Sequence, residues 1–235
     1  MRRDSMSFKG LGVVFGLALV FALLAPMDAD AQRGRGGPRL SAEESAKVWA
    51  LQSSSVAKEF GVAKRKAAKV AEAYAASRTS YQSGMQELRE SGDGGGGRFR
   101  AFRELGDEER GKFEEALKGT LKGEQLAKVM GSLGTFDRSW DRYANVLAEF
   151  ELEAAKLQKA MSLTIAYVSG VYKARQDSQD REAWREIYTE HREKLNAGMA
   201  KILSEEDQAK WTEATARRGR GGGGGRRPGG GGGGN

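Results

Sequence analysis

The chain contains no cysteine, a single histidine and only three prolines in 235 residues. Without cysteine the fold cannot use disulfides, so its stability must come from a buried apolar core. With His191 as the only histidine, neither a pair of histidine metal ligands nor a Ser/His/Asp triad can be built within one chain. All three prolines lie outside residues 40–216, so that region keeps the backbone donors that long helices need.

Only one segment has a long apolar run, from Leu11 to Ala25. It follows a basic start and precedes the small residues Ala29 and Ala31, which predicts a secretory signal over 1–31 with cleavage before Gln32. The alternative is a retained membrane anchor. Fifteen helical residues, however, span only about 23 Å, short of the roughly 30 Å hydrocarbon core. We therefore expect an exported protein of the periplasm or cell envelope that is not integral to the membrane after cleavage.

Three segments lack the apolar residues that would offset the entropy of ordering them. Residues 32–39 and 217–235 are Arg/Gly tracts and are expected to be disordered. Residues 91–98 (SGDGGGGR) read as a flexible linker. This linker divides a helical domain, 40–216, into a front part and a back part.

The positive charge of the chain resides in the two Arg/Gly tracts. The formal net charge is +7, and the eight tract arginines exceed it, which leaves the helical domain near neutral. Mobile guanidinium groups can contact phosphates or sulfates without fixed geometry. The tracts contain no aromatic residue, so base stacking is not expected. They are either polyanion-binding segments or soluble spacers, and the residues concerned are Arg33, Arg35, Arg39, Arg217, Arg218, Arg220, Arg226 and Arg227.

Within 40–216 the less polar residues recur at alternating steps of three and four, which predicts an all-α fold of long antiparallel helices with coiled-coil-like seams. The pattern runs over 63–88, over 136–171 and over 184–202. The middle run holds for about five heptads and is typical of one long helix. Its segment 162–172 is rich in β-branched and aromatic residues, but the heptad continues through it, so we expect helix there with any kink at 169–170.

A short element of the form L-x-x-E-x-x-A-K begins at Leu40, Leu121 and Leu203, at offsets of 81 and 82 residues. The second offset also pairs Arg110 with Arg192, so we predict two related helical units of about 80 residues. Serine at the second position and an acid three residues later have the spacing of a helix N-cap and its N3 residue. The middle copy has a lysine at the cap. The residues assigned to these motifs are Leu40, Ser41, Glu44, Leu121, Gln125, Leu203, Ser204 and Asp207.

These elements resemble the L-T-x-x-Q motif of the Spy/CpxP family of periplasmic helical proteins. Residues 121–125 keep the leucine and the glutamine but have lysine in place of threonine. Residues 203–207 and 40–44 keep the leucine and a hydroxyl but have an acid in place of glutamine. The resemblance implies a curved helical dimer that shields unfolded clients without ATP or senses envelope stress. Some relatives bind metals through histidines, which a chain with one histidine is not equipped to do.

Other side chains that could carry chemistry have structural explanations. Glu149 with Glu153, and Asp137 with Asp141, place acids one turn apart, and we interpret them as solvated helix faces because no Glu-x-x-His pair accompanies them. The glycine runs 94–97 and 221–225 lack the Gly-Lys-Ser/Thr turn of phosphate loops. His191 is expected in the core or in a helix seam. The four tryptophans are expected in the core: Trp49, Trp140, Trp184 and Trp211. If two of them were exposed together, they would form a client-binding patch.

The sequence therefore predicts a non-enzymatic protein without a metal or cofactor. The leading hypothesis is an ATP-independent chaperone or stress-binding protein that holds unfolded or envelope proteins on an apolar helical surface. The alternative is an envelope scaffold that binds anionic glycans, lipid headgroups or nucleic acid through its Arg/Gly tracts. The two differ in where binding occurs, on the domain or on the tracts.

Overall fold

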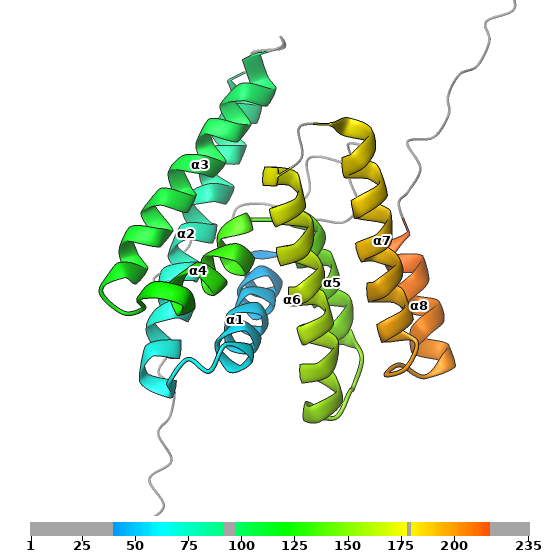
Figure 1. The fold of residues 1–235 in the computed structure, drawn as a ribbon. Helices are drawn as coiled ribbons and strands as arrows, with labels where there is room; N and C mark the ends of the chain where they lie inside the picture. Colours follow the sequence, from blue (N-terminus) through cyan, green and yellow to red (C-terminus); the bar gives the residue numbers. More distant parts are fainter. Residues whose placement is uncertain (1–39, 92–96, 178–179, 217–235) are drawn as a thin grey trace, which may run out of the picture. The chain divides into compact units, whose positions relative to one another are not determined.

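The computed structural model describes residues 40–91, 97–177 and 180–216, and these residues contain helices and connecting turns but no strand (Figure 1). The all-α prediction is confirmed. The predicted signal segment and both Arg/Gly tracts, with their eight arginines, lie outside the described residues. The elements in chain order are α1 (Ala42–Glu59), α2 (Lys64–Glu90), α3 (Gly97–Lys118), α4 (Gly123–Ser132), the 3₁₀ turn η1 (Leu133–Thr135), α5 (Arg138–Glu149), α6 (Ala154–Asp177), α7 (Arg181–Met199) and α8 (Glu205–Thr215).

None of the described helices combines the length and apolarity needed to cross a bilayer. The expected linker over 91–98 lies mostly outside the described residues, but its last two residues already belong to α3. Helices α2 and α3 on either side of it lie against each other. The front and back parts of the domain therefore share one core.

Helix α1 is central to that core, because it contacts α2, α4, α5 and α6. Its fully buried positions Val48, Gln52 and Val56 recur every fourth residue and therefore lie on one face. Ser53 is also buried, and its hydroxyl donates to the carbonyl of Trp49 at 2.8 Å. The Ser53 hydroxyl is therefore satisfied within its own helix.

Two helical hairpins, α2–α3 and α6–α7, flank α1, and a glycine permits close approach in each. A Cβ added to Gly84 of α2 would lie 2.8 Å from Leu105 Cδ1 of α3. A Cβ added to Gly170 of α6 would lie 2.3 Å from His191 Cε1 of α7. In both hairpins the large side chain comes 21 residues after the glycine. Helix α6 continues through 162–172, as predicted, and Gly170 serves interhelical contact there.

The prediction of one helix over 136–171 was wrong. The run is divided into α5 and α6 by a turn at 150–153, where Phe150 has extended backbone (φ −83°, ψ 119°) and its carbonyl accepts from Leu152 N–H at 2.6 Å. No glycine or proline marks this turn. The reason is tertiary packing: α5 and α6 both contact α1, and Phe150 is buried in the turn between them. A single helix of that length would extend about 54 Å and leave half of its apolar stripe without a partner.

Candidate binding groove

The three repeated elements begin three helices, α1, α4 and α8. At α1 the Ser41 hydroxyl accepts from Glu44 N–H at 3.2 Å, and Ser41 N–H donates to the Glu44 carboxylate at 2.7 Å, which is a complete capping box. The backbone hydrogen bond from Ser41 lowers the pKa of Glu44. At α8 the Ser204 hydroxyl accepts from Asp207 N–H at 3.1 Å but also donates to the Asp207 carboxylate at 2.8 Å, so only half of the box forms.

The middle element has a different role. Its N-cap, Lys122, makes no side-chain capping hydrogen bond. Instead, the Gln125 carboxamide donates to the carbonyls of Phe60 and Gly61 at 3.2 and 3.3 Å, which ties the start of α4 to the end of α1. The three motif leucines, Leu40, Leu121 and Leu203, belong to or contact the core. Because α4 contacts α1 whereas α8 contacts α5, the eight motif residues do not converge on one site.

The repeat extends to two arginines that bind the ends of neighbouring helices. Arg110 of α3 donates to the carbonyl of Gly134 at 3.0 Å, just beyond α4. Arg192 of α7 donates to the carbonyl of Thr215 at 2.6 Å, the last residue of α8. A guanidinium at a helix C-terminus satisfies free carbonyls and opposes the negative end of the macrodipole. The α3–α4 and α7–α8 units are therefore built on the same plan.

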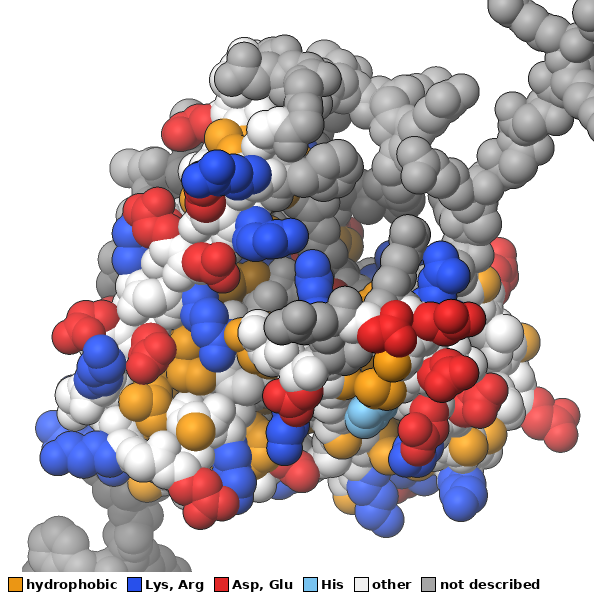
Figure 2. All heavy atoms as spheres, turned by 45° about the horizontal axis from the view of Figure 1, so that its top comes forward, with side chains coloured by type: hydrophobic (Ala, Val, Ile, Leu, Met, Phe, Trp, Pro, Cys, Tyr) orange, Lys and Arg blue, Asp and Glu red, His pale blue; other side chains and the backbone are white. Residues whose placement is uncertain are grey.

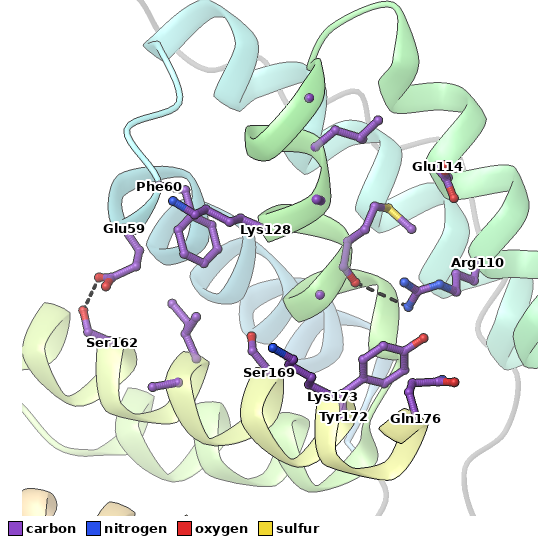
Figure 3. A pocket seen from close by; sticks show the side chains of 17 residues that line it. Glu59, Phe60, Arg110, Glu114, Lys128, Ser162, Ser169, Tyr172, Lys173 and Gln176 are labelled. Atoms are coloured by element: carbon purple, nitrogen blue, oxygen red, sulfur yellow. Dashed lines mark hydrogen bonds between the residues drawn. The ribbon is translucent and has the colours of Figure 1, made fainter. Parts of the chain in front are cut away.

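A hollow lies where α4 meets α6, with the end of α1 and a side of α3 completing its wall (Figure 3). It encloses about 830 Å³ and is open to solvent. Its apolar surface comes from Phe60 at the end of α1, from Leu126, Ala127 and Met130 of α4, and from Ile165 and Ala166 of α6. We call this hollow the α4–α6 groove. Sequence analysis did not find it, because its residues come from four helices.

Polar groups surround this apolar surface. At one end, the Ser162 hydroxyl donates to the Glu59 carboxylate, and at the other the Arg110 guanidinium lies 4.7 Å from the centre of the Tyr172 ring (Figure 3). The Ser169 hydroxyl oxygen is buried and has no hydrogen-bond partner among the described residues. The groove thus has an apolar middle and polar ends. Its lining contains no histidine and therefore no histidine base.

A buried polar cluster formed by side chains of α1, α2 and α5 corrects one sequence interpretation. Asp141 was expected on a solvated face, but its side chain is only 19 % exposed and forms an ion pair with Arg78, which is 3 % exposed. The Gln52 carboxamide donates to Asp141 at 3.1 Å, and Tyr74 OH donates to Gln52 at 2.8 Å. The partner of Asp141 is remote in sequence, which the i, i+4 spacing from Asp137 could not reveal. Asp137 instead caps α5 by accepting from Ser139 N–H at 2.7 Å.

Aromatic rings enclose the guanidinium of this cluster. Arg78 Cζ lies 5.4 Å from the Trp49 ring, 5.8 Å from Tyr74 and 5.9 Å from Phe136. Phe136 has left-handed backbone (φ 47°), a strained conformation for a bulky residue, and its ring stacks on Tyr81 at 5.3 Å. Burial raises the pKa of Tyr74, so its hydroxyl stays protonated and can donate. This cluster is enclosed by the helices and is not part of the groove.

The remaining candidate residues have structural positions. Trp49, Trp140 and Trp211 are buried as expected, whereas Trp184 is half-buried and contacts the ring of Tyr188 at 5.4 Å. No pair of exposed tryptophans occurs among the described residues. His191 lies in the α6–α7 seam. The other acid pair is exposed, with Glu149 accepting from Asn145 at 2.7 Å. Within the described residues, no group of three or more His, Asp or Glu side chains could hold a metal ion.

Comparison with known proteins gives no relative from which to transfer a role. No protein-family model matches the chain, no curated protein matches it, and no solved structure matches it. The similarity to the Spy/CpxP family therefore stays a prediction from short motifs, and any functional assignment depends on the geometry of the helical domain itself.

Proposed function

We propose that this protein is a binding protein for unfolded or partly unfolded polypeptides, which it holds by inserting their large apolar side chains into the α4–α6 groove. One observation carries the proposal: an open hollow of about 830 Å³ whose middle is apolar and whose ends are polar. Binding sites for small groups in proteins commonly have volumes of about 300–1,000 Å³ and combine an apolar lining with a few polar groups. One or two aromatic or aliphatic side chains of a client fit that description.

The polar ends suit a polypeptide better than a purely apolar molecule. Glu59 and Glu114 lie on the lining together with Lys128 and Lys173, so a segment bearing either sign of charge beside its apolar residue finds a partner there. On the face drawn in Figure 2, Lys and Arg side chains lie among Asp and Glu side chains, with hydrophobic side chains between them.

The test fills the groove without disturbing the core. Ala127 and Ala166 line it and are exposed, so Ala127→Leu with Ala166→Leu adds bulk inside the hollow on helices that accept leucine readily. The matched control is Ala76→Leu, at an exposed position of α2 that does not line the groove. Suppression of aggregation of a heat-unfolded model protein is measured without ATP for both variants and for the unaltered chain.

We expect the groove-filled variant to lose most of its protection while keeping the melting temperature of the unaltered chain, and we expect Ala76→Leu to protect normally. The protection should also persist in moderate salt, because burial of apolar surface is little screened whereas exposed charge pairs are. A folded groove-filled variant that protects as well as the control would refute the proposal.

A further inference from the structure

The helical domain carries its own basic surface at one end, apart from the Arg/Gly tracts. Four of the first six residues of α2 are basic, and all four are exposed. An antiparallel arrangement of α2 and α3 brings the last turn of α3 to the same end, since Tyr74 contacts Phe113 at 5.7 Å and Ser80 donates to Glu109 at 2.9 Å. The bonds from Gln125 to the end of α1 place the α3–α4 turn there too.

We call this surface the basic end and define it by six exposed residues: Lys58, Lys64, Arg65, Lys66, Lys69 and Lys122. None of the six forms an ion pair with another described residue. Two nearby acids are already paired with lysines outside this set. Glu115 pairs with Lys118 at 2.8 Å, and Glu124 pairs with Lys128 at 2.7 Å. Glu59 accepts from Ser162, and Glu72 is the acid one turn beyond Lys69.

The placement of these charges runs against the needs of the helix. The N-terminus of a helix carries partial positive charge, so cations in the first turn are disfavoured there. The first turns of α1, α4, α5, α7 and α8 contain acids, whereas those of α2, α3 and α6 contain none. Of these three, only α2 begins with three consecutive cations, Lys64, Arg65 and Lys66, and its N-cap, Ala63, makes no side-chain capping bond. The basic end therefore does not serve the stability of α2, and an external anionic partner would relieve the repulsion.

We infer that the basic end docks on the surface of an anionic phospholipid membrane. Clusters of four to eight Lys or Arg on a helix are typical of attraction to anionic headgroups. Five of the six residues are lysines, which act as flexible point charges, whereas geometric recognition of single phosphates favours arginine. The one aromatic ring between Lys58 and Lys69 is Phe60, which lines the α4–α6 groove, so the basic side chains themselves offer no stacking platform for the bases of single-stranded nucleic acid. A planar array of lipid charges can be contacted by long side chains that extend from neighbouring turns.

The test compares two matched pairs of substitutions in the chain that begins at Gln32, without the predicted signal segment. Arg65→Gln with Lys69→Gln removes two charges from the basic end, and Lys156→Gln with Lys159→Gln removes two exposed charges from the first turns of α6. Glutamine, lysine and arginine have similar helix propensities, so both variants keep the fold, which the melting temperature verifies. The Arg/Gly tracts are present in both and cancel in the comparison. Binding is measured by sedimentation with vesicles of phosphatidylcholine containing 30 % phosphatidylserine, and with pure phosphatidylcholine vesicles.

Each basic side chain near an anionic surface contributes on the order of fivefold in binding, so the Arg65/Lys69 variant should bind anionic vesicles about thirtyfold more weakly. The Lys156/Lys159 variant should bind as the unaltered chain does, and pure phosphatidylcholine should bind neither. Equal losses in the two variants would mean that net charge alone matters and would overturn the inference. Unchanged vesicle binding by the Arg65/Lys69 variant would also overturn the inference. This holds too if that variant loses affinity for a DNA duplex instead.

Discussion

The buried ion pair between Arg78 and Asp141 gives the sharpest stability prediction. Taking two charges out of water costs more than their attraction returns unless further hydrogen bonds help. Here the Arg78 side chain is 3 % exposed, its Nε has no partner among the described residues, and Asp141 receives one additional bond from Gln52. Consistently, burial raises the pKa of Asp141, and the Arg78 guanidinium only partly opposes the effect. The pair therefore contributes little net stability, although each partner requires the other.

Removing one partner should be far worse than removing both. Asp141→Leu leaves a guanidinium buried without compensation, and Arg78→Met leaves a mostly buried carboxylate, so each single change should lower the free energy of unfolding by about 3–5 kcal/mol. Arg78→Met combined with Asp141→Leu replaces both charges by apolar side chains, and this double variant should be as stable as the unaltered chain or up to a few kcal/mol more stable.

Urea denaturation of the four full-length chains, followed by circular dichroism, measures this cycle. The loss in the double variant should then be smaller, by several kcal/mol, than the sum of the two single losses. Single losses that simply add in the double variant would show that the two side chains act independently, and the account of a paired buried charge would be wrong.

Three further predictions follow from particular contacts. Ser41→Ala should lower the free energy of unfolding by about 1–2 kcal/mol, because it removes a complete capping box, whereas Ser204→Ala should lower it by about 1 kcal/mol or less. Thermal melts of both variants measure the two losses, and equal losses would contradict the difference in capping geometry. Gly111→Ala in α3, where an added Cβ meets nothing within 4 Å, should stabilise the fold by about 0.5–1 kcal/mol. Gly170→Ala should destabilise the fold, because the His191 ring must move, and stabilisation by both substitutions would refute this close contact. The pKa of Asp141 is raised in the fold above its ordinary value of 3.8, so its contribution to stability should fall as pH rises from 3.8 toward the raised pKa. Measuring the free energy of unfolding against pH for the unaltered chain and for Asp141→Asn isolates this trend. A contribution that rises with pH over this range would contradict the shift.

Much of the secondary structure followed from local sequence patterns. The 3–4 alternation gave the helices, and serine followed by an acid three residues later marked the starts of α1 and α8. The break between α5 and α6 could not be predicted, because the apolar stripe keeps its phase across 150–154 and no breaking residue interrupts it. Both halves of the stripe face α1, and periodicity alone does not distinguish one helix from two that share a partner.

The groove and the polar cluster were missed for a related reason. Their residues are remote in sequence: Gln52 and Asp141 of the polar cluster are 89 residues apart, and Glu59 and Ser162 of the groove are 103 residues apart. A weak signal was present for Arg78, which follows Tyr74 by one turn on an otherwise apolar stripe of α2. Without knowledge of which helices meet, however, a charged residue beside such a stripe is indistinguishable from one at its solvated edge.

The central position of α1 also has a consequence for the order of folding. Helices α2 and α3, and likewise α6 and α7, are neighbours in sequence and can pair through short chain closures, which form rapidly. Helix α1 must instead meet α5 and α6, and closing so long a loop costs more chain entropy before any contact compensates it. The two hairpins should therefore form early, and the joining of α1 to α5 through Gln52 and Asp141 should be the late event that unites them.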